Sequence, residues 1–181
     1  RQSGSGIAAR DRAIALCNIA VAQRWQGRLD DAVTHAARAL ALAEGIVAWT
    51  ARAGAWQVLA RVALEQGDLD AARDGVRESL RLWQRSGDQR GLASCLEVTA
   101  AIAATRGAAG EAATLLAAVA ALREHVVGPA SALAAAECAQ LEATLRVALG
   151  SMRFVMATER GRILTRAQAL VLAHELLEHP A

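Results

Sequence analysis

Three glycines spaced 40 residues apart constrain the fold of this chain more than any other feature. Gly27, Gly67 and Gly107 each end one helix-like run of apolar residues and precede a second. A fixed period of this length indicates a repeat architecture, in which each unit buries its apolar face only against its neighbours. Because such scaffolds bind rather than catalyse, the period predicts the fold more directly than the activity.

Helical periodicity continues along the chain, and no strand-like alternation interrupts it. The expected helices span residues 7–25, 30–44, 48–65, 69–85, 90–105, 109–125, 129–149, 151–160 and 165–178. Pro129 is expected at a first helical position, and Thr165 with Gln168 has the form of a capping box. The predicted organisation is a flexible leader or expression-vector remnant (1–6), three helix hairpins (7–125), and an irregular fourth hairpin with a capping helix (129–178).

The composition excludes several kinds of chemistry. The 181 residues carry a net charge of +2, and all basic side chains except histidine are arginine. Without lysine there is no P-loop lysine and no Schiff-base lysine. The mild charge, with both signs alternating along the helices, argues against direct nucleic-acid contact. We expect neither a membrane span nor a signal peptide. Cys17, Cys95 and Cys138 are expected to be buried thiols in a reducing cytoplasm.

Aligning the three glycines also aligns small residues in both helices of each hairpin. These are Ala20, Ala60 and Ala100 in the first helices and Ala32, Ala72 and Ala112 in the second. Small residues allow two packed helix axes to approach closely. The pattern resembles the tetratricopeptide repeat, although the period here is 40 rather than 34 residues. The resemblance implies an all-α, right-handed solenoid of antiparallel helix hairpins that ends in a capping helix.

The long period and the carboxyl end resemble one group of bacterial regulators. The segment Leu145-Arg146-Val147-Ala148-Leu149-Gly150 is followed by Phe154, Ala157, Gly161 and Leu164-Thr165. This resembles the end of the helical-repeat region in LuxR-type and AfsR-like (MalT-like) signal-transduction ATPases. In that family the helical array senses or scaffolds beside nucleotide-switching and DNA-binding or cyclase modules. The resemblance implies a non-catalytic, cytoplasmic domain that recognises a protein, peptide or small effector and adjoins other domains of its parent protein.

The repeat resemblance also implies which residues would contact a partner. Tetratricopeptide grooves bind mainly through first-helix residues that face the concave side. The polar residues at such positions are Asn18, Arg24, Gln57, Arg61 and Glu97. Arg61 is expected to be the main anchor, because it projects from the middle repeat and because the planar guanidinium pairs well with carboxylates.

No catalytic residue, metal site or cofactor is expected. His174 and His179 are five residues apart and therefore lie on different helix faces, so they do not form a zincin pair. Asp68 and Asp70 are better explained as helix caps than as calcium ligands.

Two alternatives to a recognition domain remain open. The first is a spacer or homo-oligomerisation array, with a homodimer as the simplest form, because a hydrophobic content of 54% is high for a monomer's surface. The second is a helical fragment of an enzyme that uses His35 or His125.

Overall fold

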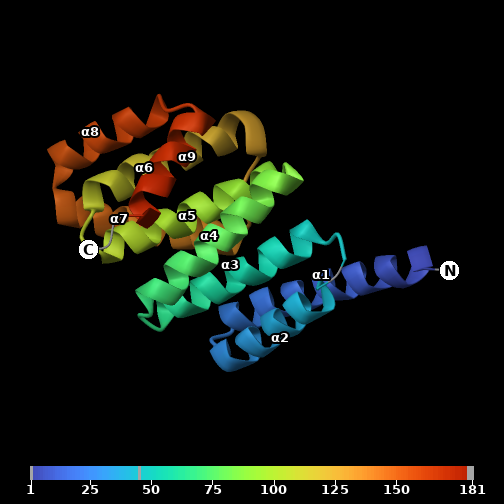
Figure 1. Ribbon diagram of the computed structural model, residues 1–181. Coiled ribbons are helices and arrows are strands. Elements are labelled where there is room, and N and C mark those ends of the chain that lie inside the picture. Colours follow the sequence, from blue (N-terminus) through green and yellow to red (C-terminus); the bar gives the residue numbers. More distant parts are fainter. Residues whose placement is uncertain (1, 45, 179–181) are drawn as a thin grey trace. The chain divides into compact units, whose positions relative to one another are not determined.

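The computed structural model describes residues 2–44 and 46–178, and every regular element in those ranges is helical. Figure 1 shows their arrangement. In chain order they are α1 (Gln2–Trp25), α2 (Leu29–Leu42), α3 (Trp49–Glu65), α4 (Leu69–Ser86), α5 (Gln89–Thr105), α6 (Ala109–Leu122), the π-helical turn η1 (Arg123–Val127), α7 (Ala132–Leu149), α8 (Ser151–Arg162) and α9 (Arg166–Glu178). The chain divides within α5 into two compact units, the first ending at Leu92 and the second beginning at Ala93.

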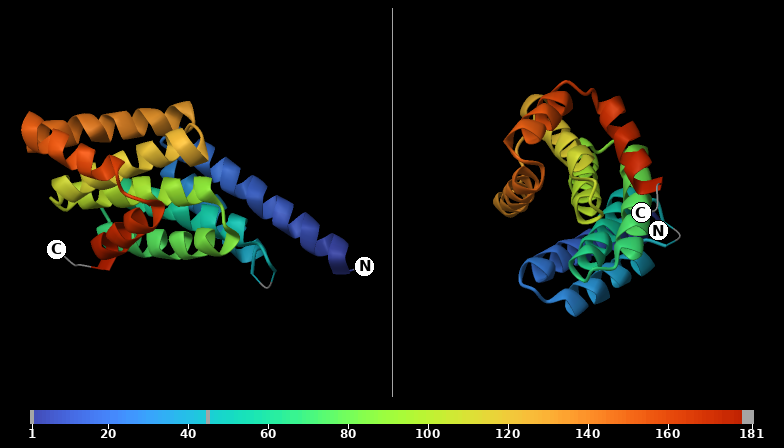
Figure 2. Two further views of the ribbon diagram at one scale, coloured as in Figure 1. Left: turned by 90° about the horizontal axis from the view of Figure 1, so that it is seen from above. Right: turned by 90° about the vertical axis from the view of Figure 1, so that its left-hand side faces the viewer.

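The amino-terminal helix is longer than the periodicity predicts. We expected a flexible leader over residues 1–6, but α1 begins at Gln2; Arg1 lies outside the described residues. The glycines at 4 and 6 weaken a helix without stopping it, and no proline or left-handed residue interrupts this segment. Figures 1 and 2 show the first turns of α1 projecting beyond its neighbour α2.

The three periodic glycines form the same turn. Gly27, Gly67 and Gly107 have φ values of +73°, +80° and +85°, a left-handed conformation that favours glycine. In each turn the N–H of the following residue donates to the carbonyl oxygen five residues earlier, at 2.9 Å. This bond is the helix-ending Schellman arrangement. The period in the sequence is therefore a period in backbone geometry.

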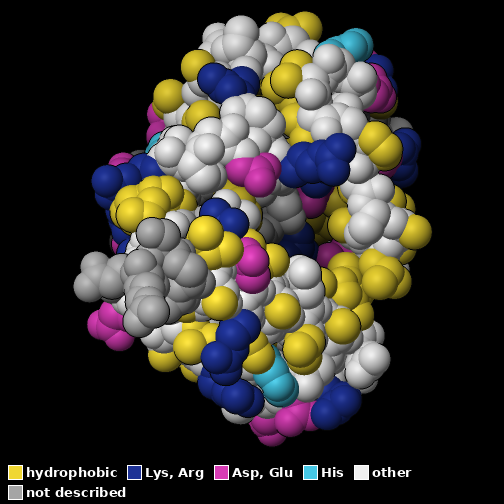
Figure 3. Space-filling view, turned by 90° about the vertical axis from the view of Figure 1, so that its right-hand side faces the viewer, with side chains coloured by type: hydrophobic (Ala, Val, Ile, Leu, Met, Phe, Trp, Pro, Cys, Tyr) yellow, Lys and Arg dark blue, Asp and Glu magenta, His cyan; other side chains and the backbone are white. Residues whose placement is uncertain are grey.

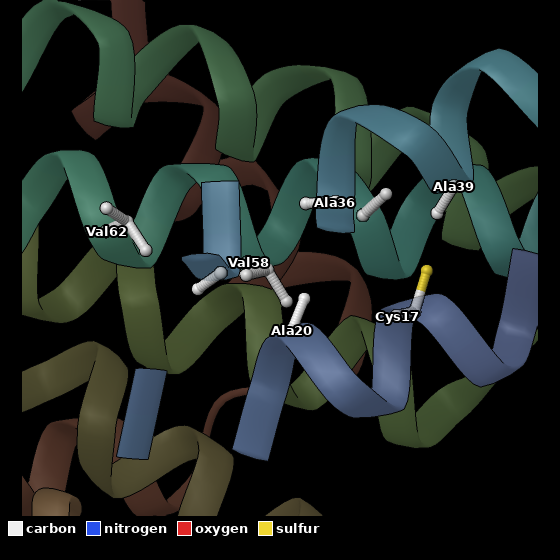
Figure 4. Close-up of a cluster of buried hydrophobic side chains, with 8 residues drawn as sticks. Cys17, Ala20, Ala36, Ala39, Val58 and Val62 are labelled. Atoms are coloured by element: carbon white, nitrogen blue, oxygen red, sulfur yellow. The ribbon is translucent and has the colours of Figure 1, made fainter. Parts of the chain in front are cut away.

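The core of the first unit is built from small side chains on α1, α2 and α3. Figure 4 shows Cys17 and Ala20 of α1 pointing toward Ala36 and Ala39 of α2 and toward Val58 of α3. The fourth helix packs closely on the third, since a Cβ added at Gly75 would lie 3.0 Å from the Ala60 Cβ. Asp68 caps α4, as the sequence predicts, by accepting a hydrogen bond from the Ala71 N–H at 3.0 Å.

In the second unit, α6 is the helix against which α7, α8 and α9 pack. Figures 1 and 2 show α8 running beside α6. The capping box of α9 forms as predicted, because Gln168 Oε1 accepts from the Thr165 N–H at 2.9 Å and Thr165 Oγ1 accepts from the Gln168 N–H at 3.3 Å. The expected start of α7 at Pro129 is wrong: the helix begins at Ala132, because Ser131 Oγ accepts from the Ala134 N–H and caps it.

The surface carries both signs of charge. On the face drawn in Figure 3, arginine side chains lie among acidic and apolar ones rather than gathering by sign. Within residues 2–44 and 46–178, no helix combines the length and the apolar character that crossing a bilayer requires.

Candidate functional site

A cavity of about 730 Å³ lies in the second unit, between α6, η1, α7 and α8. The two helices line it largely with small side chains, namely Ala113, Ala117, Ala120 and Ala121 of α6 and Ala135 and Ala139 of α7. The described side chains of α7 include only one buried residue, Leu145. Because α7 buries so few side chains and alanine side chains are short, the space between α6 and α7 is left unfilled. The volume lies in the range of small-molecule sites.

Close packing of α8 on α6 fixes one wall of this cavity. A Cβ at Gly161 would overlap the carbonyl oxygen of Thr114 and would lie 2.8 Å from the Ala117 Cβ. Phe154, the only phenylalanine in the chain, is 3% exposed and lines the cavity. A rigid contact and a buried aromatic ring therefore border the Ala-lined space.

The end of α6 is wound as a π-helix and contributes polar groups to the cavity. Residues Arg123–Val127 form this turn, and the Gly128 N–H closes it on the Arg123 carbonyl oxygen at 2.9 Å. Its first three side chains, Arg123, Glu124 and His125, all line the cavity. Single π-helical turns are frequent at functional sites, because the extra residue re-aims the side chains.

A buried ion pair joins this turn to α5. Arg123 Nε donates to Glu97 Oε1 at 2.7 Å, and the two side chains are 15% and 4% exposed. A carboxylate buried to this degree requires a charged partner. Both side chains line the cavity. A ligand in the cavity can therefore reach the guanidinium of Arg123, which has further N–H donors besides the one bonded to Glu97.

The α7–α8 side of the cavity carries a second arginine against the aromatic ring. The Cζ atom of Arg146 lies 4.3 Å from the Phe154 ring centroid, and its Nη2 pairs with Glu142 at 2.9 Å. The lining of the cavity thus combines apolar residues with charged side chains of both signs. Such a site suits a ligand with an apolar body and a polar acceptor group. In the described ranges, no three His, Cys, Asp or Glu residues lie together as metal ligands.

The sequence-predicted contact residues of the first unit occupy different environments. Asn18 is exposed on α1, whereas Gln57 and Arg61 are half-buried on α3. Arg24 is buried: it forms an ion pair with Glu65 and its Cζ lies 4.1 Å above the Trp25 ring. Of the five residues, the structure places only Glu97 in the cavity. A role for these five residues in partner binding stays a prediction.

Most residues of the cavity were missed by reasoning from sequence. Arg146 and Phe154 lie outside the three hairpins on which the groove prediction rested, and Arg123 lies at the very end of the third, away from its first helix. One signal was present in the sequence: no charged residue occurs from Ala112 to Leu122, and then Arg123, Glu124 and His125 follow together. An abrupt ionisable cluster after a long uncharged stretch marks this turn as a candidate site.

Comparison with known families identifies the repeat. Residues 11–74 match the family model of the tetratricopeptide repeat. The chain carries a tetratricopeptide-like helical repeat domain. The match spans from α1 into α4 and, with the antiparallel helices and the repeated glycine turns, confirms the all-α, tetratricopeptide-like fold class. Tetratricopeptide repeats generally mediate protein–protein interaction. No curated protein and no solved structure matches the chain.

Proposed function

We propose that this repeat domain is the non-catalytic sensor or scaffold part of a larger bacterial transcriptional or signalling regulator. Its ligand is a protein segment, a peptide or a small effector, and its work is recognition in the cytoplasm. The cavity between α6, η1, α7 and α8 supports this proposal most directly. It brings together a concave volume, apolar lining residues and a buried charge pair.

The ligand class follows from the lining. Alanine side chains present a smooth apolar surface without hydrogen-bonding groups, so they favour the apolar part of a ligand. Arg123 supplies charged donors at the π-helical turn, which favours a carboxylate or carbonyl acceptor. We therefore assign the cavity to an amphipathic organic ligand or to a peptide side chain of the same character.

A fragment library of small carboxylic acids and amides, screened by ligand-observed NMR, tests the proposal. Ala139 of α7 is exposed and lines the cavity, whereas Ala148 of the same helix is also exposed but lies outside it. An Ala139→Trp variant places a bulky side chain at the cavity wall, and Ala148→Trp adds the same side chain elsewhere. We expect fragments that bind the wild type and the Ala148→Trp variant and lose binding in Ala139→Trp.

Two results would count against the cavity. Fragments that bind all three proteins alike occupy another surface, and a library without any binder argues that the space takes no small ligand. The parent regulator is tested separately, by reading the full open reading frame. An adjoining P-loop ATPase or DNA-binding module supports that part of the proposal, and an adjoining catalytic domain of another kind contradicts it.

A further inference from the structure

The helix α8 presents a row of large apolar side chains to solvent. Its inner face, with Phe154, Ala157 and Gly161, contacts the core of the second unit. Four large apolar residues on the opposite face are exposed. They are Met152 (78% exposed), Val155 (52%), Met156 (67%) and Ile163 (80%), which directly follows the helix. We call these four residues the α8 stripe. Single exposed apolar residues are ordinary, but four on one helix face indicate an interaction site.

The spacing of the stripe favours a helical occupant. Met152, Val155 and Met156 stand in the i, i+3, i+4 relation, and Ile163 follows one heptad after Met156. This is the pattern by which one helix packs along another. At 1.5 Å per residue, the stripe runs for roughly 16 Å, about three turns of a partner helix. The two methionines add adaptable, polarisable contact surface.

One flank of the stripe is cationic. Arg153 and Arg160 are seven residues apart, so they share one side of α8, next to Met156. Both are exposed, and in the described part of the chain neither forms an ion pair with a carboxylate. Glu159 lies on the face of the stripe itself, four residues after Val155 and four before Ile163, and it is paired with Arg162, its Oε1 lying 3.3 Å from Nη1. Among the described residues, no carboxylate neutralises these two positive charges on the flank.

These charges distinguish between two kinds of occupant. An antiparallel pairing of two α8 stripes would place Arg153 of each copy beside Arg160 of the other, and like charges at a contact are unfavourable. A helix with acidic flanks meets the same arginines with opposite charge. We infer that the α8 stripe docks an amphipathic helix of a partner protein, in which acidic residues flank the apolar face. This surface is distinct from the cavity and does not depend on its ligand.

A pair of designed peptides tests this inference with the intact chain. Both are three-heptad amphipathic helices with the same leucine face; one carries glutamate on its flanks and the other carries lysine. Fluorescence anisotropy at low ionic strength measures binding of each peptide. We expect the glutamate peptide to bind, the lysine peptide to bind at least about tenfold more weakly, and the difference to shrink as salt is added.

Variants of the chain assign the binding to the stripe. Met152→Glu with Met156→Glu is expected to weaken binding of the glutamate peptide at least about tenfold, since it removes apolar contacts and adds repulsion. Val171→Glu, on the exposed face of α9, is the matched control and is expected to have no effect. Arg153→Ala with Arg160→Ala is expected to weaken binding severalfold and to flatten its salt dependence. Arg12→Ala with Arg90→Ala removes the same charge from exposed sites elsewhere and serves as its control.

Three outcomes would overturn the inference. The first is equal binding of both peptides, and the second is binding that survives the Met152→Glu, Met156→Glu change. The third is concentration-dependent dimerisation of the free chain in light scattering that this double change abolishes, because it assigns the stripe to a second copy. All substituted side chains are exposed, so an unchanged melting temperature by circular dichroism verifies that the variants fold. Fragment binding in the cavity is expected to persist in these variants, which separates this test from that of the proposed function.

Discussion

Gly161 of α8 lies directly against the backbone of Thr114 in α6, so closely that a Cβ at residue 161 would overlap the Thr114 carbonyl oxygen. Only glycine permits this approach. The contact anchors α8 on α6 beside the Ala-lined cavity, where Ala117 of α6 is also a neighbour of Gly161. The width of the cavity at this wall therefore depends on the absence of one side chain.

Replacing Gly161 by alanine is expected to lower the free energy of unfolding by about 1–3 kcal/mol, because the backbone of α6 cannot move aside as a flexible side chain can. Urea denaturation measures the change. Gly110→Ala is the matched control on α6, since a Cβ there meets nothing within 4 Å. We expect that control to be neutral or to gain up to about 1 kcal/mol. A Gly161→Ala protein as stable as the wild type would show that α6 and α8 are not in close contact.

The second prediction concerns the contribution of the Arg123–Glu97 ion pair to stability. Arg123→Met leaves the buried Glu97 carboxylate without this partner and is expected to lower the free energy of unfolding by on the order of 3 kcal/mol. Adding Glu97→Gln removes the buried charge, so the double variant is expected to be more stable than Arg123→Met alone. Arg162→Met disrupts an exposed pair with Glu159 and is expected to change stability by less than about 1 kcal/mol. If Arg123→Met behaves like Arg162→Met, the pair is open to solvent.

Cys17 gives the fold a pH dependence at alkaline pH. Burial raises the pKa of this thiol from 9.0 to about 11, and its Sγ donates to the Ala51 carbonyl oxygen at 3.1 Å. The folded state favours the neutral thiol. The contribution of the Cys17 thiol to the free energy of unfolding is therefore complete below pH 9 and is lost as the pH rises from 9 toward 11. The loss is about 2–3 kcal/mol, at roughly 1.4 kcal/mol for each pKa unit.

The amino-acid composition makes the effect of cysteine ionisation on stability simple to measure in this pH range. The chain contains no tyrosine and no lysine, so among its side chains cysteines dominate the titration between pH 9 and 11. Denaturation across this range is expected to show a smaller fall in stability for Cys17→Ala than for the wild type. Cys138→Ala is the control, because Cys138 is only partly buried and Cys95 remains in both variants. An identical fall in both variants would mean that Cys17 does not ionise differently in the folded state.

The repeated part of the fold could be predicted from the sequence because it depends on local rules. A left-handed turn favours glycine, and closely packed helices require small residues at the crossing. All six aligned alanines, including Ala60 and Ala112, are fully buried. The expected helix boundaries agree with the structure to within a few residues at most ends. At the starts of α4 and α9, Asp68 and Thr165 form the predicted caps. The start of α1 and the start of α7 are the exceptions.

The candidate site could not be predicted in the same way. Periodicity indicates which face of a helix is buried but not which side chain of another helix it meets. Arg123 and Glu97 are 26 residues apart and come together only through the packing of η1 beside α5. Arg24 was expected to contact a partner from a polar position, yet its guanidinium is buried against Glu65. The cavity itself results from an imperfect fit of α7 to α6, which no local pattern encodes.

The most direct test of the recognition cavity uses its one aromatic ring. Because Phe154 is the only phenylalanine in the chain, biosynthetic incorporation of fluorophenylalanine gives a single ¹⁹F NMR signal from the cavity wall. Adding a carboxylate fragment that binds the wild-type chain is expected to shift this signal in a saturable manner, and Ala139→Trp is expected to abolish the shift. A fragment that saturates the protein while the Phe154 signal stays unchanged would contradict the assignment of this cavity as the recognition site.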